Sequence, residues 1–205
     1  MHLFLAWRAM EDRISNIGYK LESFLYGDSR ARHTFLLACT DEHPLVLIEV
    51  DLGDTKKLIH KSMKLNIVEL DDIPSYICQI ELIGNTTSPT AFDDMVTAAN
   101  KFMKDNPHYN VYSNNCRTFV EYIIDQIPEF RERIPRKNGS ILEYYHSRAI
   151  EEHPGALIKS KQILKEIHEL HQRNREYKYA GKLVLNIQLP QFDSDTAPEI
   201  TNLRL

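Results

Sequence analysis

Apolar side chains recur at helical spacing through the first 29 residues of the chain. The stripe comprises Trp7, Met10, Ile14, Ile17, Leu21, Phe24 and Leu25, and the turn-forming sequence YGDSR follows it. Side chains three and four residues apart share one face of a helix. The pattern therefore predicts an N-terminal amphipathic helix within residues 1–29.

The next part of the chain contains short apolar runs that are rich in β-branched and aromatic residues. HTFLLACT and HPLVLIEVDLG lie on either side of the polar segment TDEHP, which is the pattern of a β-hairpin. Residues 56–70 admit another strand, and SYICQIELIG predicts a further one that ends at a Gly-Asn turn. These strands predict a small antiparallel sheet.

Two helices are predicted after the strands. In SPTAFDDMVTAANKFMKDNP, Ser88 is the expected cap, Pro89 the first helical residue and Pro107 the stop. HYNVYS then predicts a short strand or extended segment, and NNCRTFVEYIIDQI an amphipathic helix with an apolar stripe that begins at Phe119. The fold class expected from these elements is α+β, with the small sheet packed against helices.

The character of the sequence changes beyond Pro128. Residues 136–184 predict a helical extension, in which the charged helix 156–178 carries an apolar stripe and packs either on the body or on a protein partner. Residues 185–205 lack periodicity and predict a poorly ordered tail. We therefore divide the chain into 1–29, a domain over 30–135, the extension 136–184 and the tail 185–205.

Composition narrows the setting of the protein. The 205 residues include 25 Lys and Arg against 29 Asp and Glu, and no stretch collects enough positive charge to bind nucleic acid. No segment has the length and hydropathy of a membrane span. The cysteines, Cys39, Cys78 and Cys116, are odd in number and lack Cys-x-x-Cys spacing, so we expect neither disulfides nor a metal, and no cofactor. A reducing, cytoplasmic location is the expectation.

Cys116 stands at the predicted start of a helix, with Asn114 or Asn115 as its cap. A thiol in the first helical turn lies near unpaired backbone N–H groups and the positive end of the helix dipole, and both favour the thiolate. The alternative is that Cys116 is a small apolar residue of the core, which is the common environment of cysteine.

A nucleophilic cysteine needs a base, and His33 at the start of the hairpin is the first candidate. The residue opposite His33 on the returning strand is Glu49 or Asp51, depending on register. Either acid would orient the imidazole from the same face of the sheet. The alternative is that His33 merely begins a strand and that both acids face solvent.

The other histidines are weaker candidates. His60 is the main rival to His33, because it lies on or after the second strand. His108 is expected at the surface beside Pro107, and His146 and His153 fall in a charged, loop-rich region. On the late helix, His168 and His171 are expected to face solvent and lack further metal ligands.

The segment NNCRTFVEYII resembles the Asn-Cys-x-x-Phe-Val segment of circularly permuted papain-like proteins of the NlpC-type superfamily, which include the lecithin retinol acyltransferase-like and PPPDE-type families. RHTFLLACTDEHPLVLIEVDLG resembles their histidine hairpin, which precedes the cysteine in the chain. The similarity spans residues 30–135. It implies a permuted papain-like fold, with Cys116 as nucleophile and His33 as base; Glu49 and Asp51 remain inferences from the hairpin.

The resemblance implies acyl transfer through a thioester. The expected activity is hydrolysis of an amide, isopeptide or ester bond in a protein, peptide or lipid acyl substrate. Backbone N–H groups near Asn115 and Cys116 would bind the oxyanion, and Tyr112 and Asn114 would line the cleft unless they serve packing and capping. A thiol acyltransferase and an inactive papain-like interaction module are the alternatives.

The chain departs from the acyltransferase-like pattern at one place within the motif. Arg117 and Thr118 stand where those proteins usually have Glu-His, and no membrane-anchoring apolar helix is present in the sequence. Both departures argue against a lipid acyltransferase in particular.

Overall fold

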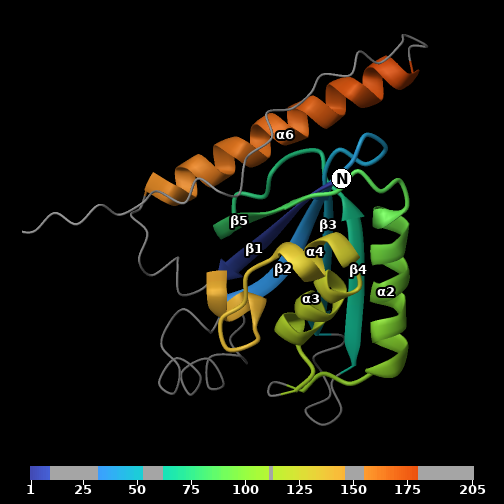
Figure 1. Cartoon of the computed structure of the whole chain (residues 1–205), viewed down its shortest axis with the longest axis vertical. Helices are drawn as coiled ribbons and strands as arrows, with labels where there is room; N and C mark the ends of the chain where they lie inside the picture. Colours follow the sequence, from blue (N-terminus) through green and yellow to red (C-terminus); the bar gives the residue numbers. More distant parts are fainter. Residues whose placement is uncertain (10–31, 53–61, 111–112, 146–154, 180–205) are drawn as a thin grey trace, which may run out of the picture.

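A computed structural model describes residues 1–9, 32–52, 62–110, 113–145 and 155–179 of the chain (Figure 1). Five strands form one antiparallel sheet in the order β4-β3-β2-β1-β5. The strands are β1 (His2–Ala9), β2 (Arg32–Cys39), β3 (Val46–Leu52), β4 (Met63–Glu69) and β5 (Ile77–Asn85). The predicted hairpin is confirmed as β2 and β3, and the α+β class is confirmed.

The start of the chain is a strand, so the prediction of an N-terminal helix is wrong for His2–Ala9. β1 lies between β2 and β5, and both of its faces are covered: Leu5 and Trp7 join one core, and Phe4 joins the other. A strand buried on both faces reads as a continuous apolar run rather than an alternating one. The rest of the predicted helix, from residue 10 to residue 29, lies outside the described residues.

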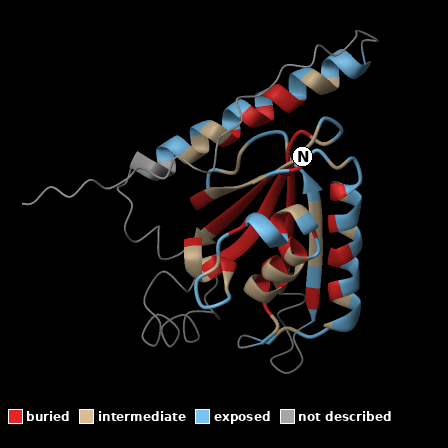
Figure 2. Cartoon of the chain, in the orientation of Figure 1, coloured by how far each residue is buried: buried red, intermediate tan, exposed pale blue. Residues whose placement is uncertain are grey.

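Helices cover one face of the sheet with a large apolar core (Figure 2). They are α2 (Ala91–Asp105), α3 (Cys116–Asp125) and α4 (Pro128–Arg133). α2 begins after Thr90, two residues later than the expected start at Pro89. α3 packs on β2 and β3, where its buried stripe of Phe119, Val120, Ile123 and Ile124 meets the sheet.

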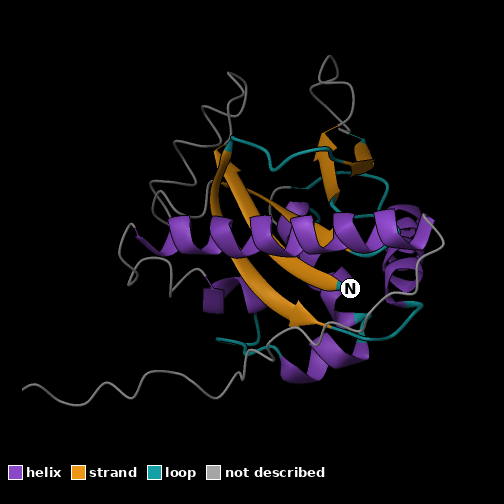
Figure 3. Cartoon of the chain, turned by 90° about the horizontal axis from the view of Figure 1, so that it is seen from above, coloured by secondary structure: helices purple, strands orange, loops and turns teal. Residues whose placement is uncertain are grey.

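The opposite face of the sheet is covered by α6 (Gly155–Tyr179), which packs against β5 and β2 (Figure 3). Leu164 and Ile167 of α6 form a second core with Phe4, Phe35 and Leu37. The charged late helix therefore packs on the body of this protein.

The two histidines of α6 are buried, contrary to the expectation that they face solvent. His168 and His171 are each 6% exposed. They lie within the helical turns that carry the apolar stripe, and the packing of this stripe on the sheet buries them as well. The predicted tail, residues 185–205, lies outside the described residues.

Candidate functional site

Cys116 is the first residue of α3, and Asn115 caps the helix. Oδ1 of Asn115 accepts hydrogen bonds from the backbone N–H groups of Arg117 at 2.9 Å and Thr118 at 3.2 Å. Thr118 Oγ1 in turn accepts from the Asn115 N–H at 2.9 Å, which completes a capping box. The cap is thus Asn115, while Asn114 donates from Nδ2 to the His108 carbonyl at 2.5 Å.

This cap decides which amide can bind an oxyanion. The amides of Arg117 and Thr118 bond the cap side chain, and the amide of Phe119 bonds the Asn115 carbonyl at 3.0 Å. N–H groups near Asn115 and Cys116 were expected to bind the oxyanion. The Asn115 N–H does not remain available for this, because it already donates to Thr118 Oγ1. Within the described residues, the Cys116 N–H is the first-turn amide that the cap leaves available.

His33 lies near the start of β2 and meets Glu49 of β3. Nε2 of the imidazole lies 2.9 Å from Glu49 Oε2, and both residues are buried, at 7% and 5% exposure. The ladder between β2 and β3 ends at Leu36 and Ile48; continued, it would place Asp51 opposite His33. The side chain that meets His33 is instead Glu49, the diagonal neighbour.

The sulfur of Cys116 meets the same strand. Hydrogen bonding from the backbone N–H of Thr34 and from the imidazole of His33 is among the causes that lower the pKa of Cys116, which places both groups beside the sulfur. Nε2 of His33 is engaged by Glu49, which leaves Nδ1 for the sulfur. The structure therefore brings together three of the predicted residues, Cys116, His33 and Glu49, in one chain of side chains.

Electrostatic interactions at the site favour the charged forms of Cys116 and His33. Burial alone would raise the pKa of Cys116, but hydrogen bonding and positive charge from His33, with the Thr34 N–H, hold it below the usual range for a thiol. Burial alone would lower the pKa of His33, but Cys116 and Glu49 raise it to about 9. Both shifts favour a thiolate beside an imidazolium over a thiol beside a neutral imidazole. By contrast, burial raises the pKa of Cys39 to about 12.

Two residues that sequence reasoning missed hold Glu49 in place. Asn66 of β4, its partner in the ladder, donates from Nδ2 to Glu49 Oε1 at 3.2 Å. Nη2 of Arg8, on β1, lies 3.3 Å from Glu49 Oε2. Burial would raise the pKa of Glu49, but His33 and Arg8 outweigh it and lower the pKa, so the carboxylate stays ionised. No sequence signal pointed to Arg8, because its segment was predicted to be helical.

The remaining candidates lie apart from this chain of side chains. Asp51 is 46% exposed at its side chain and lies 3.5 Å from Arg8 Nη2. Asn114 carries a buried Oδ1 without a hydrogen-bond partner among the described residues. Tyr112 and the rival base His60 lie outside the described residues, as do His146 and His153. His108 is exposed, as expected, and forms an isolated β-bridge with Ser62.

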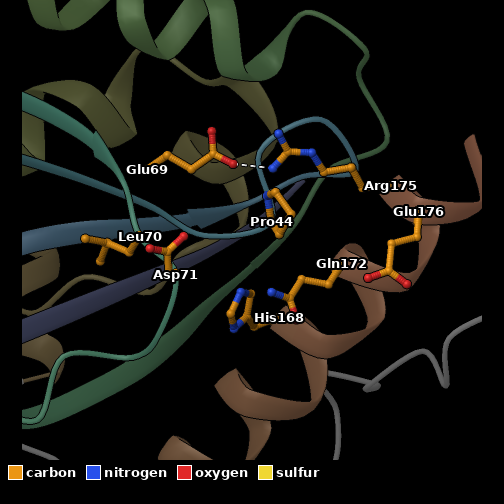
Figure 4. A pocket seen from close by; sticks show the side chains of 8 residues that line it. All are labelled: Pro44, Glu69, Leu70, Asp71, His168, Gln172, Arg175 and Glu176. Atoms are coloured by element: carbon orange, nitrogen blue, oxygen red, sulfur yellow. Dashed lines mark hydrogen bonds and ion pairs between the residues drawn. The ribbon is translucent and has the colours of Figure 1, made fainter. Parts of the chain in front are cut away.

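A pocket of about 180 Å³ lies elsewhere, between α6, the loop before β3 and the end of β4 (Figure 4). Its lining includes Pro44, Glu69, Asp71, His168 and Arg175, and Glu69 and Arg175 form an ion pair across it. None of the residues around Cys116 lines this pocket. It is a separate feature from the cysteine site.

Comparisons of the chain with protein-family models, with curated proteins and with solved structures find no match. Within the described ranges, no three His, Cys, Asp or Glu side chains are grouped so that they could hold a metal ion. No helix in the described part of the chain is long and apolar enough to cross a membrane.

Proposed function

We propose that this protein is a cysteine-dependent hydrolase that cleaves an amide, isopeptide or ester bond through a thioester, on a circularly permuted papain-like fold. The observation that carries the proposal is the buried chain from Cys116 through His33 to Glu49. Opposite pKa shifts on the thiol and the imidazole are the signature of an activated nucleophile beside its base. A cysteine held only for packing needs neither partner.

The geometry supports a two-step mechanism. The Cys116 thiolate attacks the substrate carbonyl, and the Cys116 N–H donates to the oxyanion. The His33 imidazolium gives its proton to the departing amine or alcohol, which leaves an acyl thioester on the sulfur. Neutral His33 then takes a proton from water as the water attacks the thioester, and the carboxylic acid departs from the regenerated thiolate.

The chain order supports the permuted fold. His33 lies on a strand of the antiparallel sheet that precedes the cysteine helix, as in the families that the motifs resemble. A thiol acyltransferase would use the same residues, with an amine or hydroxyl in place of water.

The second candidate is an inactive papain-like interaction module, and one observation favours it. Cys116 is only 7% exposed, so little of the sulfur is open to a substrate. In that case α6, with its exposed charged side, is the element that we expect to bind a protein partner.

Labelling of the thiols by a cysteine-directed electrophile separates the two candidates. Wild-type protein should react with iodoacetamide at Cys116 at pH 6.5 to 7, and His33→Ala should slow this reaction strongly while the protein remains folded by circular dichroism. Cys39 and Cys78 are internal controls, since Cys39 is fully buried and the Cys78 thiol donates to the Trp7 carbonyl at 3.3 Å. An inert Cys116 beside a reactive Cys78 would contradict the hydrolase.

The class of substrate is best addressed with activity-based probes. Ubiquitin-like, peptide and lipid-ester probes present the three bond types in turn, and Cys116→Ala is the control that must abolish labelling. Labelling by one probe type that depends on both Cys116 and His33 would identify the acyl donor.

A further inference from the structure

Arg8 is positioned against the base of the proposed mechanism. In the ladder between β1 and β2, Arg8 is the partner of His33. Its Nη2 lies 3.3 Å from Glu49 Oε2, the same oxygen that lies 2.9 Å from His33 Nε2. A guanidinium and an imidazole therefore share one oxygen of a buried carboxylate.

The guanidinium is itself fixed in this position. Asp51 Oδ2 lies 3.5 Å from the same Nη2, and the Tyr76 ring lies 5.5 Å from Cζ, within the range of a cation–π contact. Asn66 occupies the other oxygen of Glu49. With both of its oxygens engaged, Glu49 cannot turn away from Arg8 without losing hydrogen bonds.

We infer that Arg8 is a positioning residue that weakens the hold of Glu49 on protonated His33 and so keeps the imidazole able to lose its proton. This inference rests on the proposed role of His33 as the base. Two cations that share one anion repel each other, and each receives less of the stabilisation that the anion offers. The positive charge of Arg8 accordingly opposes the rise in the pKa of His33 that Cys116 and Glu49 cause.

The effect matters most after the thioester has formed. The sulfur then carries no negative charge, so Glu49 and Arg8 are the charged partners that remain beside His33. Water attacks the thioester carbonyl while neutral His33 accepts its proton, and the C–S bond breaks to give the carboxylic acid and the thiolate. Only the neutral imidazole can act in this step, and Arg8 favours the neutral form.

The test measures the pKa of His33 directly. Full-length protein with ¹⁵N-labelled histidine is titrated by NMR as wild type, Arg8→Gln, Arg8→Met and Arg8→Lys. Either neutral variant that is folded by circular dichroism should raise the pKa of His33 by about 0.5 to 1 unit, the size expected for one nearby charge at the edge of a protein. Arg8→Lys should leave it within about 0.3 unit of wild type. Arg32→Gln, which removes the arginine that bonds Gln79 instead, is the matched control and should move it less than Arg8→Gln.

A second readout follows the chemical step. Acetyl-Cys116, formed with p-nitrophenyl acetate and followed by intact mass spectrometry at pH 7, should persist about three- to tenfold longer in the neutral variants. An unchanged or lowered pKa of His33 in the neutral variants, or an equal rise in Arg8→Lys, would overturn the inference. The titration needs no turnover, so a failure of the proposed hydrolase appears separately, as an unreactive Cys116.

Discussion

At the scale of single residues, the structure distinguishes two acids, Glu49 and Asp51, that sequence reasoning could not separate. Glu49 is buried against His33 and accepts from it, whereas Asp51 lies at the exposed side of Arg8. Both acids share the parity of His33, so alternation along the strand admits either one. The choice depends on where the β2–β3 ladder ends, which is a property of the sheet.

The first prediction compares these two acids. Glu49→Gln removes the anion that stabilises the imidazolium, so the pKa of His33 should fall and the thiolate should be less favoured. Alkylation of Cys116 at pH 6.5 should slow by about tenfold, which corresponds to one pKa unit. Asp51→Asn should change the rate by less than about twofold, because its carboxylate is exposed and screened. A larger effect from Asp51→Asn would assign the orienting role to the other acid.

At the scale of elements, α6 is attached to the sheet by a polar chain as well as by its apolar stripe. His171 Nδ1 lies 2.6 Å from Asp41 Oδ1, and His171 Nε2 lies 3.0 Å from His2 Nδ1. With one proton on each ring, His171 donates to Asp41 and accepts from His2. If both rings are protonated, two N–H groups face each other, and the chain is broken.

The second prediction is that acid destabilises the protein by protonating the hydrogen-bonded histidines His2 and His171. Burial, the charge of His171 and the Met1 amine lower the pKa of His2 to about 4, although Asp41 opposes them. Burial also lowers the pKa of His171. Between the unfolded pKa of about 6.5 and the folded value near 4, the unfolded chain binds more protons than the native one. The free energy of unfolding should therefore fall as the pH falls through this window.

Urea unfolding at pH 7, 5.5 and 4.5 measures this effect. His2→Gln keeps a hydrogen-bond donor but cannot titrate, so its midpoint should fall less between pH 7 and pH 4.5 than that of the wild type. An equal or steeper fall in His2→Gln would place the acid sensitivity elsewhere.

At the scale of the whole molecule, the sheet separates two cores. α2, α3 and α4 pack on one face with Cys116, and α6 packs on the other (Figures 1 and 3). β1, β2 and β3 contribute side chains to both cores. Covering both faces with helices leaves the central strands fully buried, and the site lies where β2 and β3 cease to pair.

The third prediction tests the packing of α6 in solution. Leu164 is fully buried, so Leu164→Ala should lower the free energy of unfolding by about 2 to 5 kcal/mol. Ile158 is 73% exposed on the same helix, so Ile158→Ala should stay within about 0.5 kcal/mol of wild type. Urea unfolding measures both, and native-state alkylation of Cys116 should be unchanged in each. A cost below about 1 kcal/mol for Leu164→Ala would show that α6 does not dock on the sheet.

Local signals predicted much of the fold and part of the site. The hairpin follows from two apolar runs around a turn, and the start of α3 follows from Asn115 beside an apolar stripe, because a few neighbouring residues suffice to specify each. The prediction failed at β1, because an apolar run that is buried on both faces has no period to distinguish strand from helix.

The sequence by itself determined that Cys116 begins an amphipathic helix and that His33 begins a hairpin strand with two acids across from it. Only the tertiary structure decided that the sulfur meets the imidazole, that Glu49 rather than Asp51 orients it, and that Arg8 and Asn66 hold Glu49. The reason is physical: helix caps and strand periods depend on residues a few positions apart. The site instead combines residues from β1, β2, β3, β4 and α3. These elements are far apart in the sequence and come together only when the sheet and the helix pack.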